Sequence, residues 1–174
     1  KLNKVFGRII NHDKSFSGEI LFDHKINELN QRENIKDENI IIPGFIDLHC
    51  HGGNGFDTMG GIESIDKMSR YHLKNGTTSI LPTTLTANEK STIYAVEGIN
   101  QYIEKNKNLT NVLGIHLEGP FINSNKLGAQ PPYTILPDIN FIKKISNQAI
   151  IKVVPLAPEL EGSEKFINYL IKDN

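Results

Sequence analysis

The feature that most constrains the fold is a repeated alternation of short apolar runs with stretches of helical periodicity after residue 43. Such alternation is typical of a parallel α/β sheet or barrel, because parallel strands are joined by crossover connections that are usually helices. The predicted strands are residues 45–51, 77–82, 111–117 and 149–156, and the predicted helices are 62–74, 87–105, 138–146 and 163–171. Four strand–helix units are half of an eight-unit barrel, which needs about 250 residues. Either a smaller open sheet or the first half of a barrel would satisfy this pattern.

Residues 1–42 follow a different pattern of short alternating strands. The predicted strands are residues 4–10, 19–22 and 38–42. Turn-forming residues at positions 11–14 and at Ser17-Gly18 separate them. We therefore expect a small β module that precedes the α/β unit of residues 43–174.

Composition and charge exclude several classes of partner. The 174 residues are 38% hydrophobic and 22% charged, which is enough apolar material to bury a core. The net charge of -1 carries no signature of nucleic-acid or anionic-membrane binding. No apolar run reaches the roughly 18 residues of a membrane span. The single cysteine, Cys50, excludes an internal disulfide and fits a reducing compartment, so we expect a cytoplasmic protein with no nucleic-acid or membrane partner.

The strand predicted at residues 45–51 ends in His49 and His51, and two glycines follow it. Alternate residues of a strand point to the same face, so the two imidazoles should converge and supply half of the ligand set of a divalent transition metal. The alternative is one surface histidine and one hydrogen-bonded core histidine. Asp47 has the same parity and is expected either to orient the histidines or to make a structural hydrogen bond. Cys50 has the opposite parity and is expected to be a small buried side chain.

The third predicted strand ends at Glu118, with His116 two residues earlier on the same face. An ionised glutamate at the end of a buried strand is costly unless it is paired with a cation. We therefore predict Glu118 as a third metal ligand, with a salt bridge or a contact to a helix N-terminus as the alternative. His116 lies one layer deeper and is expected to pack against the ligands. Glu159, at the end of the fourth strand, is expected to have a capping or structural role.

A loop that follows Glu118 contains Gly128-Ala129-Gln130-Pro131. Glycine permits close approach of a ligand to the backbone, and glutamine offers both a donor and an acceptor, which suits a polar uncharged ligand. A plain turn would explain the same residues. The chain has no P-loop, no dinucleotide-binding glycine motif and no nucleophile elbow, so the sequence favours none of those chemistries.

Taken together, these motifs resemble those of the N-acetylglucosamine-6-phosphate deacetylases in the amidohydrolase superfamily. The matching residues are Pro43-Gly44-Phe45-Ile46-Asp47-Leu48-His49-x-His51-Gly52-Gly53, Asn75-Gly76-Thr77-Thr78, Leu81-Pro82-Thr83, His116-Leu117-Glu118-Gly119-Pro120-Phe121, Gly128-Ala129-Gln130-Pro131 and Ala157-Pro158-Glu159. The first motif indicates only the superfamily. The motif around Glu118, together with the loop after it, indicates the deacetylases.

The resemblance implies an α/β fold, in which residues 43–174 form the amino-terminal half of a (β/α)8 TIM-type barrel and residues 1–42 form part of a small β-sandwich. It implies that His49, His51 and Glu118 bind zinc or iron, with one or two ions per active site. It also implies that Ala129 and Gln130 contact the amino sugar.

The family takes its other metal-binding histidines, its acid/base aspartate and its phosphate contacts from the second half of the barrel. We therefore expect no catalytic acid/base residue before Asn174, and we expect the chain to be a fragment that is inactive alone.

The function implied by the resemblance is metal-dependent hydrolysis of N-acetylglucosamine 6-phosphate to glucosamine 6-phosphate and acetate. The substrate would be a small amino-sugar phosphate, and the full-length enzyme would be a homodimer. One alternative is another amidohydrolase that acts on a cyclic amide or a different N-acyl sugar, against which the loop at Gln130 argues. The other alternative is a truncated or split scaffold without catalytic activity.

Overall fold

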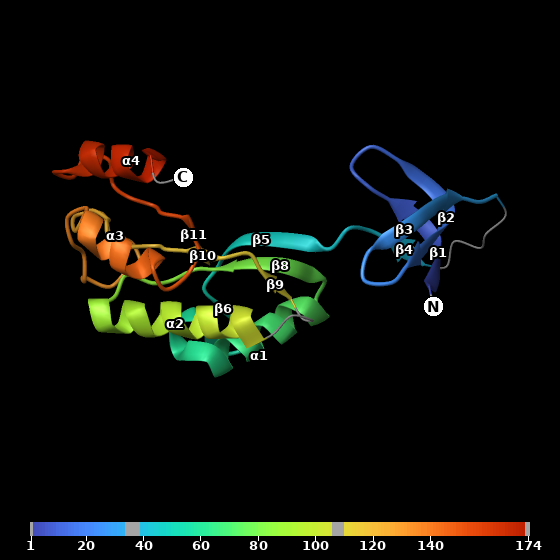
Figure 1. Cartoon of the computed structure of the whole chain (residues 1–174), viewed down its shortest axis with the longest axis horizontal. Helices are drawn as coiled ribbons and strands as arrows, with labels where there is room; N and C mark the ends of the chain where they lie inside the picture. The colour runs from blue at the N-terminus through green and yellow to red at the C-terminus, as the bar shows by residue number, and fades with distance from the viewer. Residues whose placement is uncertain (1, 34–38, 106–109, 173–174) are drawn as a thin grey trace. The chain divides into compact units, whose positions relative to one another are not determined.

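The structure is a computed structural model that describes residues 2–33, 39–105 and 110–172. The chain divides into two compact units, Lys1–Gly44 and Phe45–Asn174 (Figure 1).

The first unit is a four-stranded sheet with the strand order β3-β2-β1-β4. Its strands are β1 (Asn3–Ile10), β2 (Ser15–Phe22), β3 (Ile26–Gln31) and β4 (Ile40–Ile41). The first three run antiparallel, and β4 runs parallel to β1. An apolar hollow of about 510 Å³ opens on this sheet and is lined by residues that include Val5, Ile9, Ile20, Phe22 and Leu29.

Two predictions for this unit need correction, and one of its strands was not predicted. The residues Ser17-Gly18 lie inside β2 and do not form a turn, because Gly18 pairs with Gly7 of β1 across the sheet. The strand β3 was not predicted, since its mostly polar and exposed side chains lack the alternation of a half-buried strand. The strand predicted at residues 38–42 is only Ile40–Ile41 in the structure, and residue 38 lies outside the described residues.

The second unit contains the four predicted strand–helix units. Its main elements are β5 (Phe45–Cys50), α1 (Gly61–Lys74), β8 (Thr77–Pro82), α2 (Glu89–Lys105), β9 (Asn111–Val112), β10 (Ile115–His116), α3 (Ile139–Ser146), β11 (Ile151–Val153) and α4 (Ser163–Lys172). The strands β5, β8 and β9 form a parallel sheet, and β10 pairs in parallel with β11. A parallel bridge between Thr83 and His116 links the end of β8 to β10. Successive parallel strands therefore lie beside one another, with their carboxyl ends at one edge.

The predicted third strand is divided in two. Gly114 has a φ of 141°, a conformation that side-chain-bearing residues rarely adopt, and the ladder is interrupted there between β9 and β10. A short hairpin of β6 (Gly52–Gly53) and β7 (Phe56–Asp57), followed by the 3-10 helix η1 (Thr58–Gly60), was not predicted. The fourth strand is shorter than predicted, with only Ile151–Val153 in the ladder.

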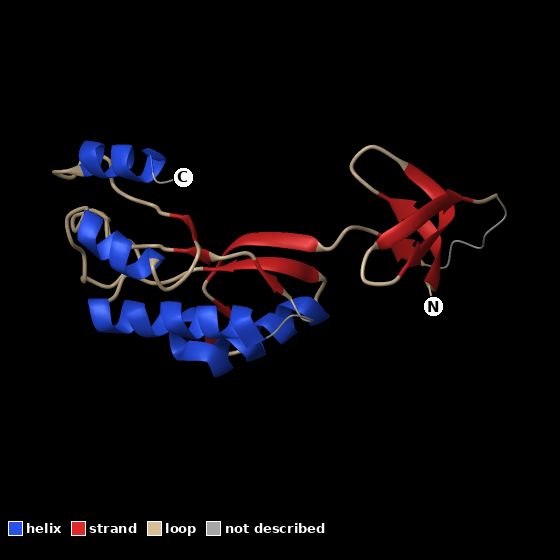
Figure 2. Cartoon of the chain, viewed as in Figure 1, coloured by secondary structure: helices blue, strands red, loops and turns tan. Residues whose placement is uncertain are grey.

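The core of the second unit lies between its strands and helices. Figure 2 shows α1 and α2 on one side of the parallel strands. Ile65 and Met68 of α1, Ile80 of β8 and Ile99 of α2 are fully buried in one apolar cluster there. The helices cover the face of the sheet, whereas the carboxyl ends of the strands carry polar side chains. The carboxyl ends of the strands are the usual location of functional sites in parallel α/β folds.

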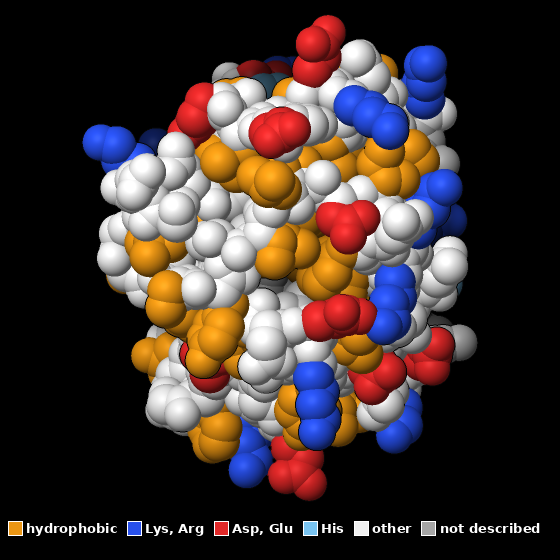
Figure 3. Space-filling view, turned by 90° about the vertical axis from the view of Figure 1, so that its left-hand side faces the viewer, with side chains coloured by type: hydrophobic (Ala, Val, Ile, Leu, Met, Phe, Trp, Pro, Cys, Tyr) orange, Lys and Arg blue, Asp and Glu red, His pale blue; other side chains and the backbone are white. Residues whose placement is uncertain are grey.

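The surface agrees with the near-neutral composition. On the face shown in Figure 3, basic and acidic side chains are interspersed with apolar ones, with no continuous region of a single charge. Among the described residues, no helix combines the length and apolar character needed to cross a bilayer.

Candidate metal centre

The three residues predicted as metal ligands come together at the carboxyl ends of β5 and β10. The Nε2 atoms of His49 and His51 are 3.1 Å apart. The Oε2 atom of Glu118 is 3.0 Å from Nε2 of His49 and 3.1 Å from Nε2 of His51. Ligand atoms about 2.0–2.1 Å from a tetrahedral Zn²⁺ lie about 3.4 Å from one another. The observed spacing is therefore close to that of ligands around one ion.

The protonation of His51 supports a cation at this position. Nδ1 of His51 lies 3.1 Å from the carbonyl oxygen of Thr83, and a carbonyl can only accept, so Nδ1 carries the proton. The lone pair is then on Nε2, which faces Glu118. Oε2 of Glu118 is buried and has no hydrogen-bond partner among the described residues. Electron-pair donors that face one another at this distance suit a cation between them, and two imidazoles with a carboxylate are ligands that a divalent transition metal prefers.

The threonines that follow β8 hold the two ligand-bearing segments together, and the sequence patterns assigned them no role. Thr83 accepts a hydrogen bond from the backbone N–H of Cys50 at 2.9 Å, in addition to its carbonyl contact with His51. The hydroxyl of Thr84 donates to the carbonyl oxygen of Glu118 at 3.3 Å. Both threonines are fully buried. The sequence signal for this role was the presence of consecutive threonines at the end of a strand. The high β propensity of threonine explains such residues equally well.

His116 packs against His49, one of the predicted ligands, in agreement with the packing role expected from its deeper position. Its ring centroid is 4.6 Å from that of His49. Its Nδ1 lies 2.9 Å from the carbonyl oxygen of Leu48, which places the proton on Nδ1. A donated hydrogen bond of this kind fixes the orientation of an imidazole beside a metal site.

The loop residues lie near the same site but differ in their contacts. Gln130 donates from Nε2 to Oε1 of Glu118 at 2.9 Å, and its Oε1 accepts from the backbone N–H of Thr86 at 2.8 Å. Ala129 is exposed beside it. The contact between Gln130 and Glu118 could not be read from sequence, because it depends on the path of the intervening loop.

The prediction that Asp47 shares the face of the two histidines is wrong. The pairing of β5 with β8 shifts register between Asp47 and Cys50, and this irregularity reverses the alternation of side chains between Asp47 and the two histidines. Asp47 pairs with Ile80, whose side chain is buried among the helices. Asp47 therefore faces α1, and its carboxylate accepts the backbone N–H of His49 at 3.0 Å.

A second group of ligand-type atoms consists of Asp47, Cys50 and His72 on the α1 side of β5. Sγ of Cys50 is 3.0 Å from Nε2 of His72, and both atoms contact the carbonyl oxygen of Gly52. Burial raises the pKa of the Cys50 thiol, and its Sγ donates to the carbonyl oxygen of Gly52 at 3.4 Å. We interpret this group as hydrogen-bonded packing, in agreement with the prediction of Cys50 as a small buried side chain.

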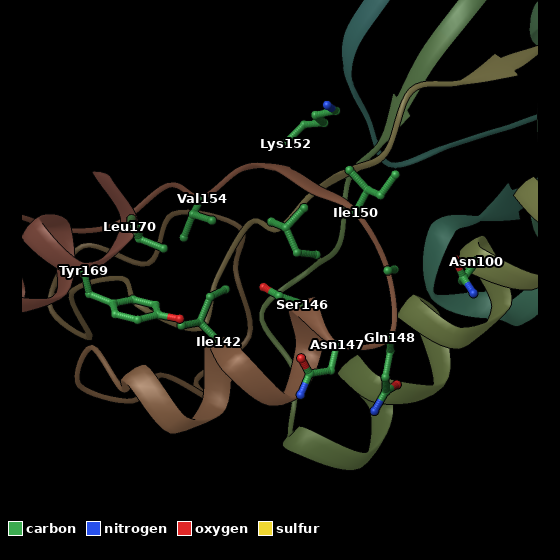
Figure 4. Close-up of a pocket in the computed structure, with 12 residues that line it drawn as sticks. Asn100, Ile142, Ser146, Asn147, Gln148, Ile150, Lys152, Val154, Tyr169 and Leu170 are labelled. Carbon is green, nitrogen blue, oxygen red and sulfur yellow. The ribbon is translucent and has the colours of Figure 1, made fainter. Parts of the chain in front are cut away.

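Glu159 has the structural role that was predicted. It accepts a hydrogen bond from Nδ2 of Asn123 at 2.8 Å, and this bond lowers the pKa of its carboxyl group. A pocket of about 530 Å³ lies elsewhere, with Asn100, Ile142, Lys152 and Tyr169 among its lining residues (Figure 4). None of the predicted site residues lines that pocket.

Comparison with known proteins defines the class. Residues 40–166 match the pattern of the Amidohydrolase family, and the chain belongs to this family. It is 39% identical over 140 residues to N-acetylglucosamine-6-phosphate deacetylase of Bacillus subtilis (strain 168) and 33% identical over 144 residues to N-acetylgalactosamine-6-phosphate deacetylase of Escherichia coli O157:H7. A solved structure of N-acetylglucosamine-6-phosphate deacetylase from Thermotoga maritima superimposes with a TM-score of 0.82 at 27% identity. The resemblance that the motifs indicated is confirmed.

The matches differ in how much of each protein they cover. The match to the Bacillus subtilis relative covers 76% of this chain but only 35% of that relative. The match to the Escherichia coli relative covers 80% of this chain but only 38% of that relative. The Thermotoga structure is covered to 47%, and this chain to 98%. The chain thus spans about a third to a half of the proteins that it matches.

Proposed function

We propose that this chain is part of a metal-dependent deacetylase that hydrolyses N-acetylglucosamine 6-phosphate to glucosamine 6-phosphate and acetate. The observation that carries the proposal is the convergence of His49, His51 and Glu118 within 3.1 Å of one another. The relatives named for this reaction support the choice of substrate.

The three residues would hold a zinc or iron ion, and the presence of both histidines gives the site capacity for a second. The chemistry that such an ion supplies is polarisation of the amide carbonyl and a strongly lowered pKa of bound water. The carbonyl oxygen of Thr83, which lies 3.1 Å from Nδ1 of His51, would hold the proton on Nδ1 and leave Nε2 free to bind the ion. Ala129 and Gln130 would lie beside the sugar. The acid/base aspartate and the phosphate contacts are expected from a part of the enzyme outside residues 1–174.

The fold proposal follows the same comparison. We propose that residues 43–174 are the first four units of a (β/α)8 barrel and that residues 1–42 are part of a β-sandwich. Four parallel strand–helix units in succession support the first assignment. The open apolar hollow on the sheet of the first unit, which a second sheet would cover, supports the other. We further propose a homodimeric cytoplasmic enzyme, on the family resemblance and the single reduced, buried cysteine.

A second candidate substrate is N-acetylgalactosamine 6-phosphate, because one relative at 33% identity bears that activity in its name. The two sugars differ only in the configuration at one ring carbon, so the metal chemistry would be the same for both.

We expect protein expressed from the complete gene to release acetate from N-acetylglucosamine 6-phosphate and to lose this activity on chelation. Activity should return on addition of Zn²⁺ or Fe²⁺, because the hydrolysis relies on a metal-lowered pKa of water. An acetate assay with both sugar phosphates, before and after chelation, makes the measurement. Faster turnover of the galactose epimer would favour the second candidate. Full activity after complete removal of metal would contradict the mechanism.

A further inference from the structure

Gln130 has both polar ends of its side chain engaged. Its amide nitrogen donates to Oε1 of Glu118 at 2.9 Å, and its amide oxygen accepts from the backbone N–H of Thr86 at 2.8 Å. Its own backbone N–H donates to the carbonyl oxygen of Leu127 at 3.0 Å, which closes the turn that carries it. The side chain thus joins the segment after β8, the carboxylate after β10 and the loop of residues 126–131.

These bonds divide the two oxygens of the Glu118 carboxylate between different partners. Oε1 receives the amide N–H of Gln130, while Oε2 faces Nε2 of His49 and Nε2 of His51. A carboxylate that is free to rotate presents either oxygen, or both, to a metal. A charge-assisted bond to one oxygen restrains that rotation and leaves the other oxygen directed at the histidines.

Gln130 accepts a hydrogen bond from a buried backbone group. Thr86 lies 1% exposed, and its backbone N–H has Gln130 as its acceptor. A buried backbone N–H is costly to leave unpaired, so this bond favours one position of the side chain. The Gln130 side chain is therefore held from one end by the buried backbone after β8, which makes its other end a rigid donor.

We propose that Gln130 is a positioning residue that orients Glu118 as a one-oxygen metal ligand and ties the loop of residues 126–131 to the metal site. This inference rests on the metal site of the proposed function. It assigns to Gln130 a task that is distinct from the contact with substrate proposed above. The bond from Gln130 to Glu118 joins the loop to the metal ligand. A change in the position of the loop therefore affects the orientation of the Glu118 carboxylate, and the reverse also holds.

The test compares two replacements of Gln130 in protein expressed from the complete gene. Gln130→Ala removes the side chain, and Gln130→Met keeps its approximate length and volume but can neither donate nor accept. Both are expected to weaken metal binding about 10- to 100-fold, the usual cost of losing a partner that orients a metal ligand. Affinity is measured by competition of Zn²⁺ with a chromophoric chelator, and folding by the melting temperature of the metal-free proteins.

Asn123→Ala is the matched control. It removes another bond between a side-chain amide and a glutamate, to Glu159 at 2.8 Å, in the chain segment that follows Glu118. Metal affinity should stay at the wild-type value in this variant. Wild-type affinity in Gln130→Met would overturn the inference, as would a wild-type protein that binds no metal. Weakened metal binding in a protein without deacetylase activity would instead support the role of Gln130 and contradict only the proposed substrate.

Discussion

Replacement of Glu118 by alanine is expected to strip the protein of most of its bound metal. Among the described residues, the carboxylate is the anionic member of the group formed with His49 and His51, and its Oε2 lies 3.0 and 3.1 Å from the two histidine nitrogens. Loss of a direct ligand should exceed the roughly 10- to 100-fold loss of affinity that follows removal of an outer partner. Elemental analysis of dialysed protein gives the metal content per chain.

Glu159→Ala is the control for this prediction. Glu159 is also a carboxylate after a strand of the second unit, but its contact is with Asn123 and not with the histidines. Its replacement should leave the metal content at the wild-type value. An unchanged metal content in Glu118→Ala would mean that the metal is bound elsewhere.

A polypeptide of residues 1–174 alone is expected to show no measurable deacetylase activity. The family resemblance places the acid/base aspartate and two further metal-binding histidines outside this segment. The structure also leaves apolar side chains uncovered, since Phe45, Ile46 and Leu48 of β5 are 58%, 64% and 55% exposed. Among the described residues β5 pairs only with β8, so its other edge is open. We expect the isolated segment to associate or to fold only in part.

Activity should appear when the missing part is supplied. The carboxyl-terminal portion of the Bacillus subtilis relative, beyond the region that matches this chain, is a suitable partner for co-expression. Acetate release from N-acetylglucosamine 6-phosphate is measured for residues 1–174 alone, for the partner alone and for both together. The same mixture with Glu118→Ala controls for activity of the partner. Robust turnover by residues 1–174 alone would contradict the interpretation of this segment as half of an active site.

The sequence predicted the parts of the structure that depend on periodicity. Apolar runs alternating with helical spacing identified all four strand–helix units, because burial on one helical stripe and within parallel strands leaves a clear pattern. The convergence of His49, His51 and Glu118 followed from two further regularities. Residues two apart share a face of a strand, and parallel strands end at a common edge.

The features that the sequence did not predict depend on local departures from regular strand pairing and from periodicity. Asp47 was assigned to the wrong face because the register of β5 shifts between Asp47 and Cys50, and nothing in its composition marks a bulge. The interruption at Gly114 was hidden within an otherwise apolar strand. The contact of Gln130 with Glu118 spans a loop whose path no periodicity determines. The face of Asp47, the interruption at Gly114 and the contact of Gln130 are all determined by tertiary structure.

The most direct test of the metal site is anomalous X-ray diffraction at the zinc and iron absorption edges, from crystals of the protein grown with its metal. We predict a peak at one of these edges, next to Nε2 of His49, Nε2 of His51 and Oε2 of Glu118. A peak between Cys50 and His72, or metal-loaded crystals with no peak beside Glu118, would contradict it.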